Sequence, residues 1–183
     1  MYWRNAILLK MILLFSIFIS CSDKELDYCK MLELDQSFVN SDTTELEKFN
    51  ENRSKRKQLI KKNFNDIIEY SDLFGFPEMG NLNVSGIDSC RNWAVFITCF
   101  HIGQIEPQLF FEHETVEVLS REIQRGNLES SSLFTSLREG FRNHKFCESQ
   151  KDFILQTLEK WNIRIEELPT IKFEHCHNKF KYI

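Results

Sequence analysis

The sequence predicts a mainly α-helical, compact multi-helix domain with a possible short C-terminal β-hairpin. The chain has 183 residues, 42% of them hydrophobic and 17 of them Phe, which is enough apolar material for a substantial core. It has only 6 Gly and 3 Pro, too few chain breakers for a many-turned β-sandwich. Apolar residues also recur at three- and four-residue steps, which is typical of amphipathic helices.

The first twenty residues have the order of a secretory signal peptide. Arg4 and Lys10 precede an apolar run over residues 11–19, and the small residue Ser20 stands before Cys21. The apolar run is too short to span a membrane, because a spanning helix needs about 20 apolar residues. We therefore divide the chain into a signal peptide (1–20), a lipid-anchored tether with a short helix (21–42) and a helical domain (43–183).

A long helix is expected to follow the tether. Two possible capping boxes open it, in which Asp42 precedes Glu45 and Thr44 precedes Glu47 by three residues. Its end is expected near Phe74, because a Gly and a Pro follow. Its apolar positions lie at helical spacing, namely Leu46, Phe49, Ile60, Phe64, Ile67 and Ile68.

The next two helices are expected to be the most apolar part of the body. Asp88 is a suitable N-cap for a helix that is apolar almost all round from Trp93 to Ile102, so we expect this helix to be buried and central. Pro107 suits the first position of the following helix, and Gly126 suits its end. Its apolar residues recur at steps of seven.

The last third of the chain predicts two shorter helices and a strand. Residues 130–132 and Ser149 are polar starts for helices with apolar residues at helical spacing. The pattern then changes, because Ile171, Phe173 and His175 alternate with charged residues. A terminal strand, or a hairpin around residues 177–179, is expected there.

The cleavage region resembles a bacterial lipobox. It reads Phe18-Ile19-Ser20-Cys21, with Phe18 where Leu is usual. In lipoproteins the signal peptidase cuts before this cysteine, whose thiol then carries diacylglycerol, and the mature N-terminus a further acyl chain such as palmitate. Residues 22–25, Ser-Asp-Lys-Glu, resemble the export signal that takes Bacteroidetes lipoproteins to the surface of the outer membrane. The resemblance implies an outer membrane lipoprotein of the cell envelope; the other reading is a plain secreted protein with an ordinary Cys21.

Residues 53–143 resemble the uncharacterised bacterial family known as domain of unknown function 6624. The resemblance lies in a basic helix running into Gly75-Phe76-Pro77, an apolar helix around Trp93-Ala94 ending at His101, and a helix opened by Pro107. The Gln-His-Ala-Asp run of that family reads Phe-His-Ile-Gly here, around His101. The resemblance implies a helical domain and no known activity, so no catalytic residue is predicted.

Acylation of Cys21 would leave five cysteines, an odd number that cannot all pair within the chain. One or two disulfides are plausible in an oxidising compartment. Cys90 and Cys99 are expected on one helix, about 13 Å apart, which is too far for a bond between them. Cys90 with Cys147 is one suggested pair, and the pattern is otherwise open.

Two short motifs contain potential metal ligands. His113-Glu114-x-x-Glu117 begins like a metalloprotease helix, with Glu117 where the second His would stand. On an extended strand His175 and His177 point to one face, where they could share a zinc or copper ion. The alternatives are a boundary histidine at position 113 and a solvated, His-rich tail.

One stretch of the long helix is strongly basic. Arg53, Lys57 and Lys61 share a helix face there, and could contact an anionic surface such as lipid or lipopolysaccharide phosphate. A solvated helix face is the commoner role of such residues. The formal net charge of -4 gives no reason to expect nucleic acid as a partner.

The sequence leaves two hypotheses of function. The first is a membrane-anchored module without chemistry or cofactor, which binds an envelope protein, an envelope polymer or lipid. The second is a zinc-dependent envelope enzyme that uses His113, Glu117, His175 and His177. The chain has no Gly-x-Ser-x-Gly elbow, phosphate-binding loop, Cys-x-x-Cys pair or dinucleotide fingerprint.

Overall fold

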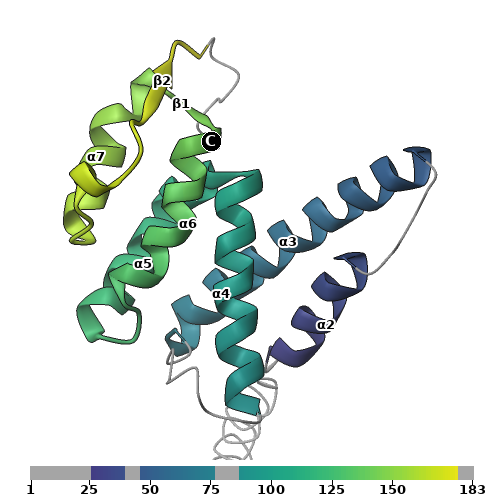
Figure 1. Cartoon of the computed structure of the whole chain (residues 1–183). Coiled ribbons are helices and arrows are strands. Elements are labelled where there is room, and N and C mark those ends of the chain that lie inside the picture. The colour runs from purple at the N-terminus through teal and green to yellow at the C-terminus, as the bar shows by residue number, and fades with distance from the viewer. Residues whose placement is uncertain (1–25, 40–45, 77–86, 177–183) are drawn as a thin grey trace, which may run out of the picture.

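The structure is a computed structural model that describes residues 26–39, 46–76 and 87–176. This part of the chain contains six α-helices, α2 to α7, three short 3-10 helices and one small sheet, as Figure 1 shows. The mainly helical fold class is therefore confirmed. Several sequence predictions fall outside the described residues: the signal peptide, Cys21, the capping residues Asp42, Thr44 and Glu45, Pro77, and the hairpin with His177.

The first three helices pack against one another. They are α2 (Tyr28–Val39), α3 (Leu46–Phe74) and α4 (Ile87–Ile105), and α4 contacts both of the others (Figure 1). Tyr28 and Met31 of α2 are buried in the same core as the second half of α3. The short helix expected within residues 21–42 is therefore an integral layer of the helical body.

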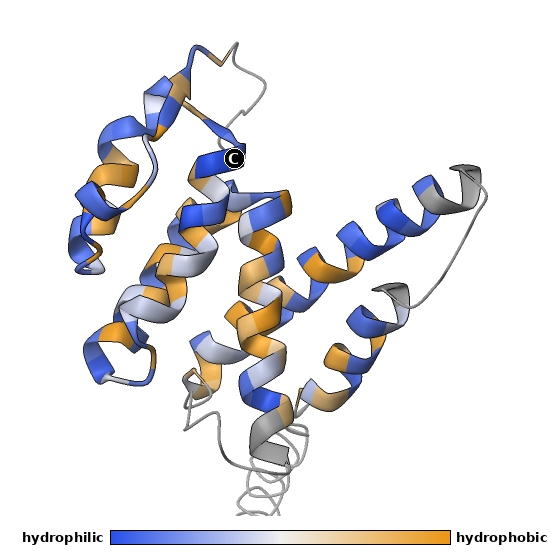
Figure 2. Cartoon of the chain, in the orientation of Figure 1, coloured by the Kyte–Doolittle hydropathy of each residue, from blue (hydrophilic) through white to orange (hydrophobic). Residues whose placement is uncertain are grey.

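The two ends of α3 have different surroundings. Its first turns extend beyond the other helices and are strongly hydrophilic (Figure 2). Its second half carries the buried apolar positions that the sequence predicted, including Phe64 and Ile67. The helix ends at Phe74 as expected, because Gly75 adopts a left-handed conformation with φ 87° that glycine accepts at no steric cost.

The helix α4 is central, but it is not buried all round. It packs against α2, α3 and α6 through Ala94, Val95, Cys99 and Ile102. Its remaining face is at least partly exposed, with aromatic residues at steps of three and four: Trp93, Phe96 and Phe100. The apolar pattern therefore correctly predicted the helix but overestimated its burial.

The helix predicted from Pro107 to Gly126 is two elements. A 3-10 helix, η1 (Pro107–Phe111), precedes α5 (His113–Arg125), because Glu112 between them is extended at φ -75° and ψ 142°. This break turns two consecutive residues, Phe110 and Phe111, into the core, which a regular helix face does not readily do. Gly126 closes α5 with φ 77°, as the sequence predicted.

The C-terminal third pairs two strands that are distant in sequence. After α6 (Ser130–Asn143) come β1 (Lys145–Cys147), η2 (Glu148–Gln150), α7 (Lys151–Lys160), η3 (Ile165–Glu167) and β2 (Lys172–Glu174). The expected strand is present, but it pairs with β1 in parallel, so within the described residues it is not half of a hairpin. A parallel pair needs a long crossover, and α7 supplies it.

Aromatic rings join these C-terminal elements to the rest of the core. Phe111 of η1 lies at their centre, with ring centroids 6.0 Å from Phe141, 5.8 Å from Phe146 and 6.1 Å from Trp161. All four rings are buried, and the indole Nε1 of Trp161 donates a hydrogen bond of 2.9 Å to the hydroxyl of Ser120. Because η1 places Phe111 in the core, this one ring packs against Phe141 of α6, Phe146 of β1 and Trp161 at the end of α7.

The helices α4 and α6 approach each other through small residues. A Cβ atom added at Gly103 would lie 2.1 Å from the backbone oxygen of Ser136, and one at Gly140 would lie 3.2 Å from the backbone oxygen of Gly103. The two backbones therefore touch directly, and only glycine fits at position 103 without moving a helix.

We predict that Gly103→Ala destabilises the protein by roughly 1–3 kcal/mol, because the added methyl group overpacks the contact and forces the backbones apart. The higher helix propensity of Ala, worth about 1 kcal/mol, offsets only part of this cost. Urea unfolding followed by circular dichroism measures the change. Gln104→Ala, at the exposed neighbouring position, is the control and should stay within about 0.5 kcal/mol of wild type. Equal stability of the two variants would contradict the close contact.

Candidate functional site

Two disulfide bonds join elements that are far apart in sequence. Cys29, at the start of α2, bonds Cys90 near the start of α4, with the Cα atoms 4.9 Å apart. Cys147, at the end of β1, bonds Cys176 just after β2, with the Cα atoms 5.4 Å apart. The suggested pair of Cys90 with Cys147 is therefore wrong, because the α2–α4 packing brings Cys29 to Cys90 and the parallel strands bring Cys176 to Cys147.

Cys99 is the free thiol of the described residues, and it is buried within the core on α4. Burial raises its pKa to about 12, because the thiolate would lose its hydration. A thiol of this kind is inert toward oxidants and electrophiles at neutral pH, since the thiolate is the reactive form.

A cluster of charged side chains lies where α2, α3 and α4 meet. Asp35 of α2 is only 4% exposed, and its Oδ1 accepts a hydrogen bond of 3.3 Å from Nε of Arg56 on α3. The Oδ2 atom of Asp35 lies 3.3 Å from Nδ1 of His101 on α4. Arg56 and His101 also contact each other, with 3.2 Å between Nη2 of Arg56 and Nε2 of His101, so each of the three side chains contacts the other two.

The hydrogen bonds of this cluster determine its protonation. A guanidinium can only donate, so Nε2 of His101 accepts from Arg56 and the ring proton lies on Nδ1, facing Asp35. Burial alone would raise the pKa of Asp35, but the hydrogen bond from His101 and the guanidinium of Arg56 lower it below its ordinary value. Asp35 is therefore ionised, and the cluster holds three helices in one arrangement.

Sequence reasoning missed this cluster, although weak signals for it exist. Asp35 follows Tyr28 and Met31 at helical spacing, so it lies on the buried stripe of α2. His101 interrupts an apolar run, and Arg56 belongs to the basic stretch that we expected to be solvated. A polar residue on an apolar face points to a buried partner, but the sequence does not show which partner.

A second buried carboxylate joins α5 to the end of α3. Glu122 is fully buried and accepts hydrogen bonds from the backbone N–H of Phe76 at 3.0 Å and from Nδ2 of Asn127 at 2.8 Å. Arg121 and Arg125 each donate to its other oxygen at 3.1 Å. Burial acts to raise the pKa of Glu122, yet these donors, Phe76 first among them, lower it. Glu122 therefore stays ionised, and its carboxylate joins α5 to the segment that follows α3.

The predicted basic face of α3 is partly paired within the protein. The Nζ atoms of Lys61 and Lys57 lie 3.0 Å and 3.6 Å from the carboxylate of Glu106, between α4 and η1. Arg53 is exposed one turn earlier on α3. Lys57 and Lys61, two of the three residues expected to contact an anionic surface, are thus already paired with a carboxylate of the protein itself.

The predicted metal ligands lie on separate elements. His113 is exposed at the start of α5, with its ring centroid 4.9 Å from that of Phe153, and Glu117 is exposed on the same helix. His175 is exposed after β2, and the neighbouring Cys176 is bound in a disulfide. Across residues 26–39, 46–76 and 87–176, no three His, Cys, Asp or Glu side chains are grouped to hold a metal. The zinc site stays a prediction, because His177 lies outside these ranges.

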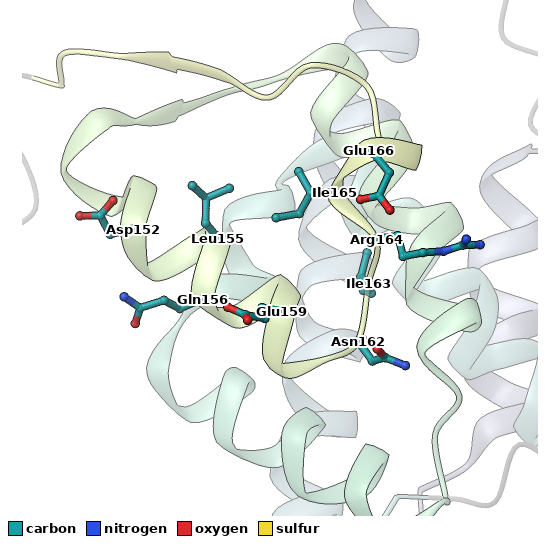
Figure 3. A pocket seen from close by; sticks show the side chains of 9 residues that line it. All are labelled: Asp152, Leu155, Gln156, Glu159, Asn162, Ile163, Arg164, Ile165 and Glu166. Atoms are coloured by element: carbon teal, nitrogen blue, oxygen red, sulfur yellow. The ribbon is translucent and has the colours of Figure 1, made fainter.

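A shallow depression lies beside α7 (Figure 3). It has a volume of about 390 Å³ and is open to solvent, between α7 and residues 162–166. Leu155 and Ile165 point toward each other across it, while Arg164 points away. Its lining mixes aliphatic with charged groups and contains none of the residues predicted for a site: Asp152, Leu155, Gln156, Glu159, Asn162, Ile163, Arg164, Ile165 and Glu166.

Comparisons with known proteins find no match for the chain. No family model matches it, and neither a curated protein nor a solved structure matches it. The resemblances stated for the cleavage region and for residues 53–143 therefore stay expectations. Within the described residues, no helix has the length and apolar content needed to cross a membrane.

We predict that Asp35→Asn lowers the free energy of unfolding at pH 5 by roughly 1–3 kcal/mol, because it weakens a buried charged hydrogen-bond circuit. The folded-state pKa of Asp35 is lowered, so its ionisation stabilises the fold above the unfolded-state pKa of about 3.9. This contribution is lost as the pH falls from that value through the folded pKa. The gap between wild type and variant should therefore narrow at pH 3.

Urea unfolding at pH 5 and pH 3 checks this prediction. Glu33→Gln is the matched control, since it removes an exposed carboxylate from the same helix. A gap for Asp35→Asn that is no larger than that for the control would show that the cluster does not stabilise the fold.

We further predict that Cys99 is alkylated by iodoacetamide only after unfolding in concentrated guanidinium, because the native thiol is buried and protonated. Peptide mass mapping locates the adduct, and Cys99→Ala should lack it. Alkylation of Cys29, Cys90, Cys147 or Cys176 without a reductant would contradict the disulfide pattern.

Proposed function

We propose that this protein is a bacterial outer membrane lipoprotein, anchored through acylated Cys21, whose helical body acts as a binding module of the cell envelope. Its partner on this proposal is an envelope protein, an envelope polymer or lipid. No metal, cofactor or catalytic residue is part of the proposal.

The disulfide pattern is the observation that carries this proposal. Disulfides persist in oxidising compartments and are rare where glutathione and thioredoxin keep thiols reduced. The protein has two of them, Cys29–Cys90 and Cys147–Cys176, both closing long loops of the chain. They support export, in agreement with the order of residues in the first twenty positions.

The count of cysteines supports acylation in particular. Of the six cysteines in the chain, four are paired with each other and Cys99 is enclosed in the core. The cysteine that remains is Cys21, directly after the signal-like segment. An exported protein with a single unpaired, accessible thiol would risk crosslinking, whereas a thioether to diacylglycerol removes that risk.

The buried acids support a binding role over a catalytic one. Asp35 and Glu122 have donors from several elements around them and lowered pKa values. Catalytic carboxylates that act as acids or bases near neutral pH need the opposite shift. These two buried carboxylates of the described residues are thus suited to holding elements of the fold together.

The intact mass of protein extracted in detergent from native membranes, without reduction, tests the proposal. We expect residues 21–183 plus acyl groups, less four hydrogens for two disulfides. The matched variant Cys21→Ser should lack acyl groups and be missing from the detergent phase. A full-length mass without acyl groups, found in the soluble fraction, would refute the anchor.

A further inference from the structure

Exposed apolar side chains are concentrated at one end of the molecule. The described residues contain five exposed large hydrophobic side chains, and three of them lie where α3 ends and α4 begins. Leu73 is 70% exposed, Phe74 55% and Trp93 42%. Large exposed apolar groups that gather in this way usually mark an interaction surface. The other two, Leu34 and Ile165, lie apart on α2 and η3.

A chain of contacts joins the end of α3, which carries Leu73 and Phe74, to the starts of α2 and α4. The ring centroid of Tyr70 lies 4.9 Å from that of Phe74 and 6.5 Å from that of Tyr28, at the start of α2. The guanidinium of Arg91, two residues before Trp93, lies 5.6 Å from the centroid of the Tyr28 ring. In Figure 1 the start of α2, the end of α3 and the start of α4 all lie toward the lower edge. We call Leu73, Phe74 and Trp93 the apolar end.

The proposed lipid anchor joins the body at this same end. Cys21 precedes Cys29 by eight residues, a span of at most about 28 Å even when fully extended. The disulfide then holds Cys29 against Cys90, which lies three residues from Trp93, or about 4.5 Å along the axis of α4. A bilayer that holds the lipid of Cys21 is therefore within short reach of the apolar end.

The carboxylate next to Leu73 is paired with an arginine. Asp72 stands next to Leu73, and its Oδ1 accepts a hydrogen bond of 2.9 Å from Nη1 of Arg121. The Nη2 atom of the same guanidinium donates to the backbone oxygen of Ser71 at 3.0 Å, an oxygen that also accepts from the backbone N–H of Gly75. The carboxylate next to Leu73 is therefore paired with a cation, while Glu69 is exposed one turn earlier on α3.

We propose that the apolar end rests on the bilayer, with Trp93, Leu73 and Phe74 entering the interfacial region of the phospholipids. The proposal rests on the acylation of Cys21, and it adds a second membrane contact to the lipid. Trp side chains favour the membrane interface, where the ring meets the acyl boundary and the N–H meets the headgroups. The acyl chains of Cys21 hold the protein to the bilayer, and the second contact at the apolar end would fix the orientation of the body on it.

The tryptophans of the protein allow a direct test. The chain has 3 Trp, and Trp3 lies in the segment that processing removes. Trp161 is 0% exposed, so in the mature protein Trp93 is the indole that lipid can reach. The native lipoprotein is reconstituted into vesicles of phosphatidylcholine or of its brominated analogue, in which bromine atoms quench nearby indoles on contact.

We expect brominated vesicles to lower the tryptophan emission of wild type by a third or more relative to plain vesicles. Trp93→Phe should lose most of this quenching, because only Trp161 remains. Phe74→Glu should reduce it by at least half, whereas Ile165→Glu, which places the same charge at an exposed apolar site elsewhere, should leave it unchanged.

The mass of the same sample separates the two proposals. An acylated protein with equal emission in both kinds of vesicle would overturn the contact of the apolar end and leave the anchor standing. An acylated protein in which Ile165→Glu reduces quenching as much as Phe74→Glu would also overturn it. A protein without acyl groups would overturn the anchor and, with it, this inference.

Discussion

The covalent bond between Cys29 and Cys90 is the constraint on which the arrangement of the N-terminal half depends. The helix α2 has only 12 residues, a length at which an isolated helix is marginal in water. Closing a loop over a sequence separation of 61 stabilises the fold by roughly 4 kcal/mol on the chain-entropy account. The bond thereby holds α2 against α4, so that Asp35 can meet His101 and Tyr28 can meet Tyr70. It also fixes the start of α2 beside the start of α4.

The packing around α4 follows from three kinds of contact on different faces. Toward α6, the backbones of the two helices touch at Gly103. Toward α2 and α3, His101 contacts the charged side chains of Asp35 and Arg56. Between these two regions lies an apolar face with Ile102 and Cys99. The face that remains carries the partly or largely exposed aromatic residues Trp93, Phe96 and Phe100. A helix that is apolar nearly all round thus serves both a core and an exposed surface.

Much of the fold could be predicted from the sequence because its signals are local. Helical spacing of apolar residues and the glycines at positions 75 and 126 were enough to locate the helices and the ends of α3 and α5. The break at Glu112 was not predictable, since it depends on both Phe110 and Phe111 finding the core. The partner of β2 was missed for a similar reason, because parallel pairing with β1 is decided by the packing of α7.

The site predictions fared less well, since they depend on residues that only the tertiary structure brings together. His101, Arg56 and Asp35 come from three helices, and each could have been read alone as a core, solvated or capping residue. The same holds for the cysteines, where spacing excluded the pair of Cys90 with Cys99 but could not select Cys29 as the partner. Lys57 and Lys61 matched the expected helix face, yet the sequence did not reveal Glu106 beside them.

The central claim is that the Cys29–Cys90 bond fixes the start of α2 to the start of α4, and peptide mapping without reduction tests it most directly. Protein isolated from native membranes is digested under conditions that prevent thiol exchange, and the linked peptides are identified by mass. The account predicts one peptide pair that joins Cys29 to Cys90 and another that joins Cys147 to Cys176. Cys29 and Cys90 recovered as free thiols, or bonded to other cysteines, would contradict it.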